Sequence, residues 1–162
     1  MADRPAFPML SWPEAKTIIE EGRLDLLGRS IEQQATYRAF REQIQVEWVS
    51  VSDYILCCKL QYSETTAADG KRVAIRPTTV ESPRTVLLEN DFPYNFDTGI
   101  SHFVLWKIGG EVLQADIDAA VHQLRATYNA TDTAVYINPP HLKSILDLEH
   151  AHILFVCQQA VT

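Results

Sequence analysis

The sequence predicts an α+β domain in which a helical N-terminal third precedes a mainly antiparallel sheet with one long inserted helix. Capping boxes at Ser11 and Ser30 open helices in the first third. Short runs rich in branched apolar residues follow residue 70, and one amphipathic helical pattern at 111–128 interrupts them. The chain has 162 residues, close to the length of one domain, so we expect residues 1–162 to share a single core.

The first predicted helix begins at a capping box. Ser11 and Glu14 have the required spacing, and Pro13 between them is favourable in the first turn of a helix. We expect this helix to run to about Glu21. Gly22 should end it, because glycine readily adopts the left-handed conformation that closes many helices.

Two more helical segments complete the helical part of the chain, residues 11–60. Ser30 and Gln33 repeat the capping-box spacing. Residues 50–60 also fit helical spacing, and residues 1–10 are expected to form a flexible arm ahead of the helices. The apolar side chains of the second helix recur at steps of three to five residues, roughly on one face: Ile31, Ala35, Phe40, Ile44 and Trp48.

Residues 71–162 form the sheet part, beyond a polar stretch at 63–70 that we expect to be irregular. An amphipathic helix is expected at 111–128, and the turn-rich run 90–95 interrupts the strands. Five runs have the branched apolar residues or the alternation that is typical of strands. The expected strands are 71–76, 84–89, 101–107, 134–137 and 150–156.

Charge and composition exclude several classes of function. The chain carries 14 Lys and Arg against 21 Asp and Glu, a net charge of −7, and its basic residues are scattered. A nucleic-acid binder needs a basic surface to neutralise phosphates, so we expect no nucleic-acid partner. No apolar run approaches the ~20 residues that span a bilayer, and no signal-peptide pattern opens the sequence, so we expect no membrane partner. Three cysteines, two of them adjacent, do not form a disulfide framework, which favours a cytoplasmic protein.

Two histidines near the C-terminus are the strongest candidates for chemistry. His150 and His152 are two residues apart on a predicted strand, so both imidazoles project from one face, with Cα atoms about 7 Å apart. This spacing suits a nucleophile beside its acid–base partner, or two ligands of one metal ion. The alternative is a strand whose polar face contacts solvent. We expect both side chains to be lightly buried, because the strand that carries them is the last in the chain.

Two blocks of the sequence resemble a family of fungal and bacterial proteins of the N-acetylglucosamine-induced type, long classed as a domain of unknown function. The first block covers residues 90–107 and contains His102, and the second covers 136–145 and continues at 149–153. His102 alone would be interpreted as a surface residue, and the resemblance gives it weight. The N-terminal part is also similar, at Trp12, Arg29, Ser30, Tyr37, Asp53 and Tyr54.

The same blocks look, more distantly, like the histidine-triad superfamily of nucleotide hydrolases and transferases. That resemblance implies a HIT-like fold and makes His152 the nucleophile that attacks the substrate phosphorus. By the same resemblance His150 and His102 would support it, and Asn138 would orient the histidines. Leu154 stands where that superfamily has a third histidine or a glutamine. We expect the substrate to be bound by Asn90, Tyr94, Asn95, Trp106 and Ser144.

The sequence leaves three hypotheses of function. The first is a small enzyme with a histidine-centred pocket and no required cofactor, acting on a small polar metabolite such as a nucleotide, a phosphorylated sugar or a specialised fungal metabolite. Hydrolase, transferase and lyase reactions are compatible with it. The second is a metal-dependent enzyme in which His102, His150 and His152 hold zinc and leave a fourth position open. The third is a sensor that binds a small ligand without turnover. A homodimer is compatible with all three.

Overall fold

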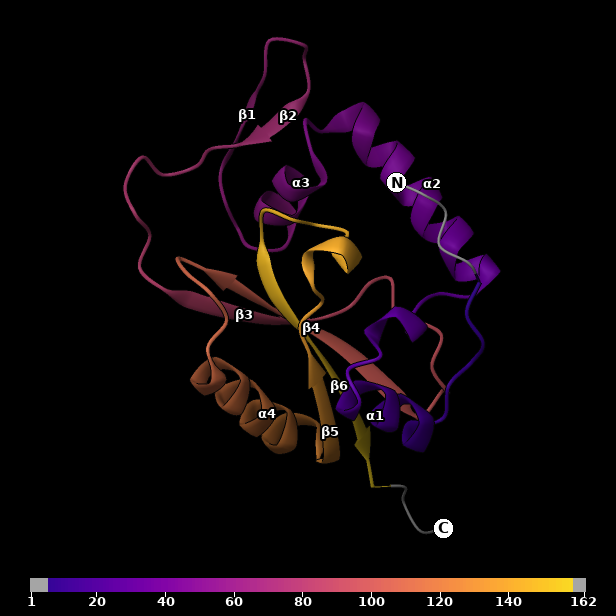
Figure 1. Ribbon diagram of the computed structural model, residues 1–162. Helices are drawn as coiled ribbons and strands as arrows, with labels where there is room; N and C mark the ends of the chain where they lie inside the picture. Colours follow the sequence, from indigo (N-terminus) through magenta and orange to yellow (C-terminus); the bar gives the residue numbers. More distant parts are fainter. Residues whose placement is uncertain (1–5, 159–162) are drawn as a thin grey trace.

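A computed structural model describes residues 6–158 and contains four α-helices and six strands in that range (Figure 1). The predicted fold class is confirmed, because three helices precede the strands and the fourth lies between strands of an antiparallel sheet. Residues 1–5 and 159–162 lie outside the described residues. None of the helices in the described range is long and apolar enough to cross a membrane.

The helices gather in the first third of the chain, apart from one that is inserted in the sheet. They are α1 (Trp12–Glu20), α2 (Ile31–Glu47), α3 (Val51–Cys58) and α4 (Gln114–Tyr128), with short 3-10 turns η1 (Leu24–Leu26) and η2 (Pro140–Leu142). The strands are β1 (Glu64–Thr66), β2 (Arg72–Ala74), β3 (Arg84–Glu89), β4 (Ile100–Ile108), β5 (Ala130–Tyr136) and β6 (Glu149–Cys157).

Both predicted capping boxes are present. The Ser11 hydroxyl accepts the backbone N–H of Glu14, and the Glu14 carboxylate accepts the backbone N–H of Ser11 at 2.8 Å. Ser30 and Gln33 exchange the same two hydrogen bonds at the start of α2. After α1, Gly22 has a φ of +70°, the left-handed conformation that closes the helix. The local sequence therefore determines where these helices begin and end.

Two boundaries and one short strand differ from the prediction. α4 begins at Gln114, later than predicted, because the backbone of its N-cap residue Leu113 is extended, with φ −96° and ψ 159°. β5 begins at Ala130, earlier than predicted, directly after Asn129 ends α4 with a φ of 55°. Its first residues are polar because β5 is an edge strand. The stretch expected to be irregular contains β1, which pairs with β2 and is exposed along its length, so no apolar pattern marks it.

The segment before α1 is bonded to the rest of the fold. Phe7 donates its backbone N–H to the Arg29 carbonyl at 3.1 Å and accepts from Asn95 Nδ2 at 2.8 Å. Leu10 is buried and donates its N–H to the Asn95 carbonyl. The expectation of a flexible arm over 1–10 is therefore wrong for the later half of that range, and its first five residues lie outside the described part of the chain.

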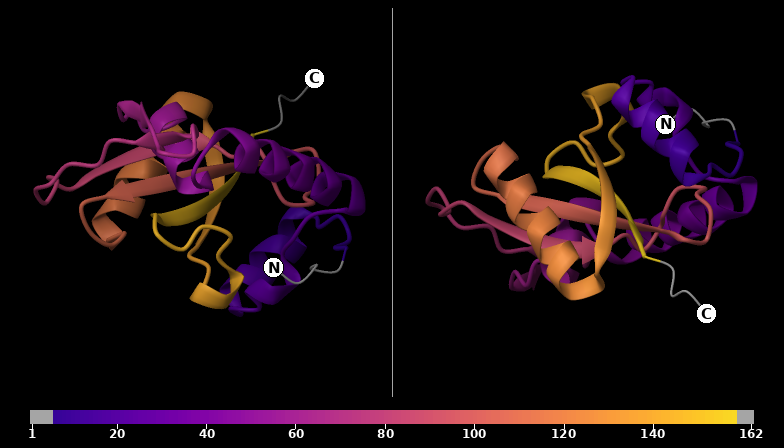
Figure 2. Two further views of the ribbon diagram at one scale, coloured as in Figure 1. Left: turned by 90° about the horizontal axis from the view of Figure 1, so that it is seen from above. Right: turned by 90° about the horizontal axis from the view of Figure 1, so that it is seen from below.

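Four strands form the main sheet in the order β3-β4-β6-β5, and every neighbouring pair is antiparallel. α4 covers one face of this sheet, and α1 and α3 cover the other (Figure 2). On the α4 side, Leu105 and Ile153 pack with Leu124 in one apolar cluster. On the opposite side there are two separate clusters, one joining Leu154 to α1 and one joining Val104 to α3. The inner strands β4 and β6 are therefore buried on both faces.

One ion pair on the α4 side of the sheet is buried. Lys107 projects from β4, and only 5% of its side chain is exposed. Its Nζ donates to Asp116 Oδ2 at 2.7 Å, and the same oxygen accepts the backbone N–H of Leu113 at the start of α4. The hydrogen bond from Lys107, with that from Leu113, holds the pKa of Asp116 below its usual value. The pair fixes the N-terminal end of α4 against the sheet.

Asp116→Ala is expected to lower the free energy of unfolding by about 3 kcal/mol, because it leaves the Lys107 ammonium buried without its partner. Lys107→Met replaces the charge with an apolar chain of similar length and should change that free energy by less than about 1 kcal/mol. Urea unfolding followed by circular dichroism measures both. A loss in Asp116→Ala no larger than the loss in Lys107→Met would show that the ion pair does not anchor α4.

Candidate functional site

The three predicted histidines meet on the sheet face that α1 and α3 cover. His150 and His152 lie on β6, opposite Trp106 and Val104 of β4. His102 lies on β4 two residues before Val104, which makes it the diagonal neighbour of His152. All three histidines are buried, with at most 6% of their surface exposed. The expectation of light burial is wrong, because the last strand in the chain is an inner strand of the sheet.

Hydrogen bonds determine which ring nitrogens of His102 and His152 carry protons. The backbone N–H of Tyr94 donates to His102 Nδ1 at 3.3 Å, so that nitrogen has the lone pair. In the neutral ring the proton is then on Nε2, which donates to His152 Nδ1 at 2.9 Å. Asn90 Nδ2, itself a donor, lies farther from the same His102 nitrogen, at 3.4 Å, and a protonated Nε2 cannot accept from it, so the shorter contact with His152 is the hydrogen bond of this nitrogen. The proton of neutral His152 is therefore on its Nε2, which makes that nitrogen a hydrogen-bond donor.

His150 has the opposite arrangement. Its Nδ1 lies 2.8 Å from the Leu148 carbonyl oxygen, which can only accept, so Nδ1 carries the proton. The Nε2 of the neutral ring then has a lone pair, as a base requires. The Trp106 ring packs against His150 with 4.9 Å between centroids. The ring centroids of His150 and His152 are 5.3 Å apart. The two neighbouring rings therefore offer different groups, an acceptor at His150 Nε2 and a donor at His152 Nε2.

Two tyrosine rings enclose His152. Tyr136 lies opposite it on β5 and stacks at 4.7 Å between centroids with an interplanar angle of 7°. Tyr94 lies at 5.9 Å, and its hydroxyl accepts a hydrogen bond from Asn138 Nδ2 at 3.4 Å. The orienting role of Asn138 stays a prediction, because its side chain is bonded to Tyr94 and not to a histidine. Asn138 reaches the histidines only through the tyrosine that packs against them.

Burial keeps all three imidazoles neutral. Desolvation lowers the pKa of His102 to about 3, and the positive charge of Arg29 adds to this effect. Desolvation also lowers the pKa of His152 well below its ordinary value, with repulsion from His102 and His150 as further causes. The pKa of His150 is lowered by the same burial, while the hydrogen bond to the Leu148 carbonyl opposes the shift. Each ring therefore has one protonated nitrogen at neutral pH.

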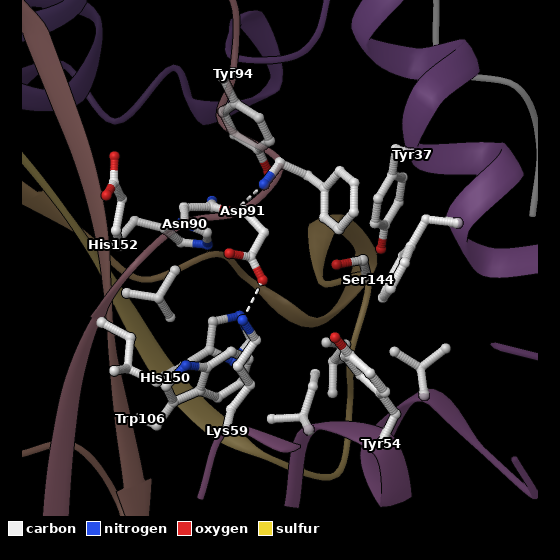
Figure 3. Close-up of a pocket in the computed structure, with 18 of the residues that line it drawn as sticks. Tyr37, Tyr54, Lys59, Asn90, Asp91, Tyr94, Trp106, Ser144, His150 and His152 are labelled. Carbon is white, nitrogen blue, oxygen red and sulfur yellow. Dashed lines mark hydrogen bonds and ion pairs between the residues drawn. The ribbon is translucent and has the colours of Figure 1, made fainter. Parts of the chain in front are cut away.

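A cavity of about 90 Å³ lies beside His150 and His152, between the sheet, α2, α3 and the loop after β3 (Figure 3). Its wall carries four charged side chains, which are Arg29, Lys59, Glu89 and Asp91. The wall is otherwise rich in aromatic rings from α2, α3, the loop and β4, namely Tyr37, Phe40, Tyr54, Phe92, Tyr94 and Trp106. This combination suits a ligand with a flat apolar part and a few polar groups.

The cavity wall contains most of the residues predicted to bind substrate. Four of them line it: Asn90, Tyr94, Trp106 and Ser144. Asn95 does not, because its side chain donates to the Phe7 carbonyl and its backbone N–H donates to the Gly28 carbonyl. Its predicted role in substrate binding is corrected, since it holds the segment before α1. His102 also lies off the wall, behind the His152 ring to which it donates.

Comparison with known protein families agrees with the family resemblance. The family described as "Protein of unknown function (DUF3605)" matches residues 11–156, which include the three helices of the N-terminal part and all of the main sheet except the last residue of β6. The chain belongs to the DUF3605 family. The match begins at the Ser11 capping box and ends on β6, after both histidines of that strand.

Relatives of this DUF3605 chain include two fungal proteins. It is 30% identical over 159 residues to the uncharacterized protein YPL067C of Saccharomyces cerevisiae, covering 88% of this chain and 77% of that protein. It is 23% identical over 107 residues to N-acetylglucosamine-induced protein 1 of Candida albicans, covering 59% of this chain and 42% of that protein. Among solved structures, the crystal structure of HTC1 is similar, with a TM-score of 0.61 and 25% identity over 90% of this chain and 84% of that one. These names specify no reaction, so the function has to be argued from the site.

Several residues of the cavity wall in this chain were not predicted as site residues. The N-terminal part of the resemblance contains Arg29, Tyr37 and Tyr54 without a role, and the structure places all three in the cavity wall. Lys59 and Asp91 form an ion pair of 2.5 Å there. Nothing local marks this pair, because one residue ends an apolar helix and the other lies in a polar turn more than thirty positions away.

The three histidines do not provide the donor set of a zinc site. Both ring nitrogens of His102 are engaged, one by the N–H of Tyr94 and one by His152. One nitrogen remains on His152 and one on His150. Within residues 6–158, no group of three or more His, Cys, Asp or Glu side chains is placed to hold a metal ion. A catalytic zinc ion takes three protein ligands, so the arrangement does not fit the metal hypothesis.

Purified protein is accordingly expected to carry substoichiometric zinc. Elemental analysis should find no metal in one-to-one ratio with the chain, and incubation with a chelator should leave the melting temperature unchanged, because the histidine nitrogens are bonded to one another and to the backbone. Stoichiometric zinc whose loss accompanies His102→Ala would restore the three-histidine metal site.

Stability should decrease in mild acid because of these rings. An unfolded histidine takes up a proton near pH 6.5, whereas folded His102 resists protonation down to about pH 3. Between those values the unfolded state binds more protons than the folded state. The free energy of unfolding should therefore decrease as the pH is lowered, by up to about 1.4 kcal/mol per pH unit for each such histidine. His102→Gln should reduce the slope by about that amount. An equal slope in His102→Gln and in the parent protein, measured by urea unfolding from pH 7 to pH 5, would show that His102 is charged in the fold.

Proposed function

We propose that the chain is an enzyme that acts on a small polar metabolite by general acid–base catalysis, with His150 as the base. The observation that supports this most directly is the opposite protonation of two adjacent rings beside one cavity. His150 has the lone pair of Nε2, and His152 has the N–H of Nε2. The first tautomer is held by the Leu148 carbonyl, and the second by the Tyr94 N–H acting through the His102 ring. A base beside a hydrogen-bond donor suits proton transfer from a hydroxyl group or a water molecule.

In this mechanism His150 Nε2 removes a proton from a substrate hydroxyl or from an attacking water. The electron pair of the broken O–H bond stays on the oxygen, which bonds to the electrophilic atom of the substrate. The bond from that atom to the leaving group breaks, and its electron pair goes with the leaving group. The Nε2–H of His152 stabilises the negative charge that develops. The imidazolium of His150 still donates from Nδ1 to the Leu148 carbonyl, which favours the charged ring, and it returns its proton to the leaving group.

His102 is a positioning residue in this proposal. It does not line the cavity, and burial lowers its pKa too far for it to act as a base near neutral pH. Because its Nδ1 accepts from the Tyr94 N–H, its Nε2 carries the proton and donates to His152 Nδ1. His102 thereby fixes the tautomer of His152. Without that hydrogen bond, His152 could exchange tautomers and present a lone pair where a donor is needed.

The distant resemblance to the histidine-triad superfamily supports hydrolase or transferase chemistry on nucleotides or phosphorylated sugars. The cysteine content of the chain supports a cytoplasmic place for this reaction. In that pattern His152 would be the nucleophile. The hydrogen bonds favour His150 instead, because His152 Nδ1 accepts from His102 and its other nitrogen carries the proton. A HIT-like reaction in this chain would therefore begin at His150, without a cofactor.

His150→Gln is expected to lower the rate at least ~100-fold while the protein stays folded, because it removes the base from the cavity wall. The assay first screens nucleotides, nucleotide sugars and phosphorylated amino sugars for turnover, and then compares variants on the substrate that is found. His122→Gln is the matched control, since it removes an exposed imidazole outside the cavity and should keep the full rate.

Turnover at the parent rate by folded His150→Gln would remove His150 from the mechanism. Tight binding of a screened compound without turnover by the parent protein would favour the sensor hypothesis. A substrate-free measurement is also available, because the free Nε2 of His150 should react with diethyl pyrocarbonate, whereas both nitrogens of His102 are engaged and should not.

A further inference from the structure

An ion pair lies across the cavity beside the histidines. Lys59 Nζ, from the end of α3, meets Asp91 Oδ2, from the loop after β3, at a distance of 2.5 Å. Figure 3 shows the two side chains reaching toward each other from different walls, with the dashed line between them in the middle of the cavity. The pair takes space that a ligand needs, and the remaining volume of about 90 Å³ holds only a few water molecules.

The two partners are not equally free to move. Lys59 is the C-terminal cap residue of α3, where a cation is favoured by the helix dipole, and its side chain is 31% exposed. Asp91 lies in a bend outside any strand or helix, and its side chain is 48% exposed. The Asp91 carboxylate can therefore swing to solvent at small cost, whereas the ammonium remains at the cavity wall. The hydrogen bond from Lys59 to Asp91 also raises the pKa of Lys59, so the ammonium is charged at neutral pH.

The charges of the cavity wall balance only while the ion pair is closed. Arg29 and Lys59 are positive, Glu89 and Asp91 are negative, and the histidines are neutral. The Arg29 guanidinium donates twice to the Phe92 carbonyl. When Asp91 leaves, the wall gains one net positive charge, located at Lys59. A ligand that fills the opened cavity restores the balance if it is an anion.

Aromatic rings determine the shape of the rest of the ligand. Phe40 and Phe92 pack at 4.5 Å between centroids, and Tyr37 and Tyr54 extend the same group on either side. Trp106 lines the sheet side of the cavity and covers His150. Flat apolar groups gain most from such a wall, because ring faces and edges can pack against them.

We propose that the cavity binds a small planar organic anion, whose carboxylate or phosphate group replaces the Asp91 carboxylate at Lys59 Nζ. Asp91 then acts as an internal competitor that closes the empty cavity and leaves when the substrate enters. This inference rests on the proposed function only in taking this cavity as the substrate site, and it names the chemical class of that substrate.

Isothermal titration calorimetry with three probes tests the inference. Phenyl phosphate carries both a ring and an anion, inorganic phosphate has only the anion, and benzyl alcohol has only the ring. Phenyl phosphate should bind more tightly than either of the others. Lys59→Met should weaken its binding at least about tenfold, because a charged hydrogen-bond partner is lost. Asp91→Asn should tighten it about two- to fivefold, because a partly exposed ion pair of this kind no longer competes.

The matched control is Glu64→Gln, which breaks the ion pair between Glu64 and Arg72 on the β1–β2 hairpin, at similar exposure and away from the cavity. It should leave all three affinities unchanged. Weaker binding of phenyl phosphate by Asp91→Asn would overturn the inference, and so would equal binding by Lys59→Met and the parent protein. His150→Gln separates this proposal from the proposed function: if it binds phenyl phosphate normally but still turns over substrate, the anion site stands and the catalytic role fails.

Discussion

The antiparallel register between β4 and β6 is the constraint on which the site depends. It places Val104 opposite His152 and Trp106 opposite His150, so that His102 becomes the diagonal neighbour of His152. Successive side chains on a strand alternate between the two faces of a sheet. A slip of one residue would therefore move the β6 histidines to the face that α4 covers. The apolar clusters on both faces prevent that slip, because it would bring polar rings into contact with Leu124 and its neighbours.

Burial and chemistry are linked in these histidines. A buried imidazole is tolerated only when its nitrogens are hydrogen-bonded, since an unsatisfied polar group in the core is destabilising by roughly 1–3 kcal/mol. His102 meets this requirement at both nitrogens, with the Tyr94 N–H and His152. His150 meets it at Nδ1, with the Leu148 carbonyl, and lines the cavity, where its Nε2 keeps a lone pair for a ligand. Because a backbone group can act only as a donor or only as an acceptor, the same bonds that make burial tolerable also assign the proton on each ring. The site is therefore set in one protonation pattern before any ligand arrives.

The N-terminal helices complete a site whose reactive groups lie in the C-terminal half. α2 supplies Tyr37 and Phe40 to the cavity, and α3 supplies Tyr54 and Lys59. The family match covers residues 11–156 and so includes these helices together with the sheet. The similarity to the crystal structure of HTC1 covers 90% of the chain. A shared fold does not assign a reaction, because function resides in the groups that a particular cavity brings together.

The sequence by itself determined the helices, the strands of the main sheet and the most conspicuous part of the site, but not the exposed strand β1. Ser11 and Ser30 start their helices through hydrogen bonds to residues three positions away, which need no tertiary contact. The two-residue spacing of His150 and His152 places both on one strand face. The tertiary structure alone decided how deeply the histidines are buried, because the last strand in the chain is an inner strand of the sheet. It also decided the pairing of Lys59 with Asp91, the bond of Asn138 to Tyr94 and the structural use of Asn95. These contacts join residues that are far apart in the chain, and their energies depend on the packing of the helices on the sheet, which no local pattern encodes.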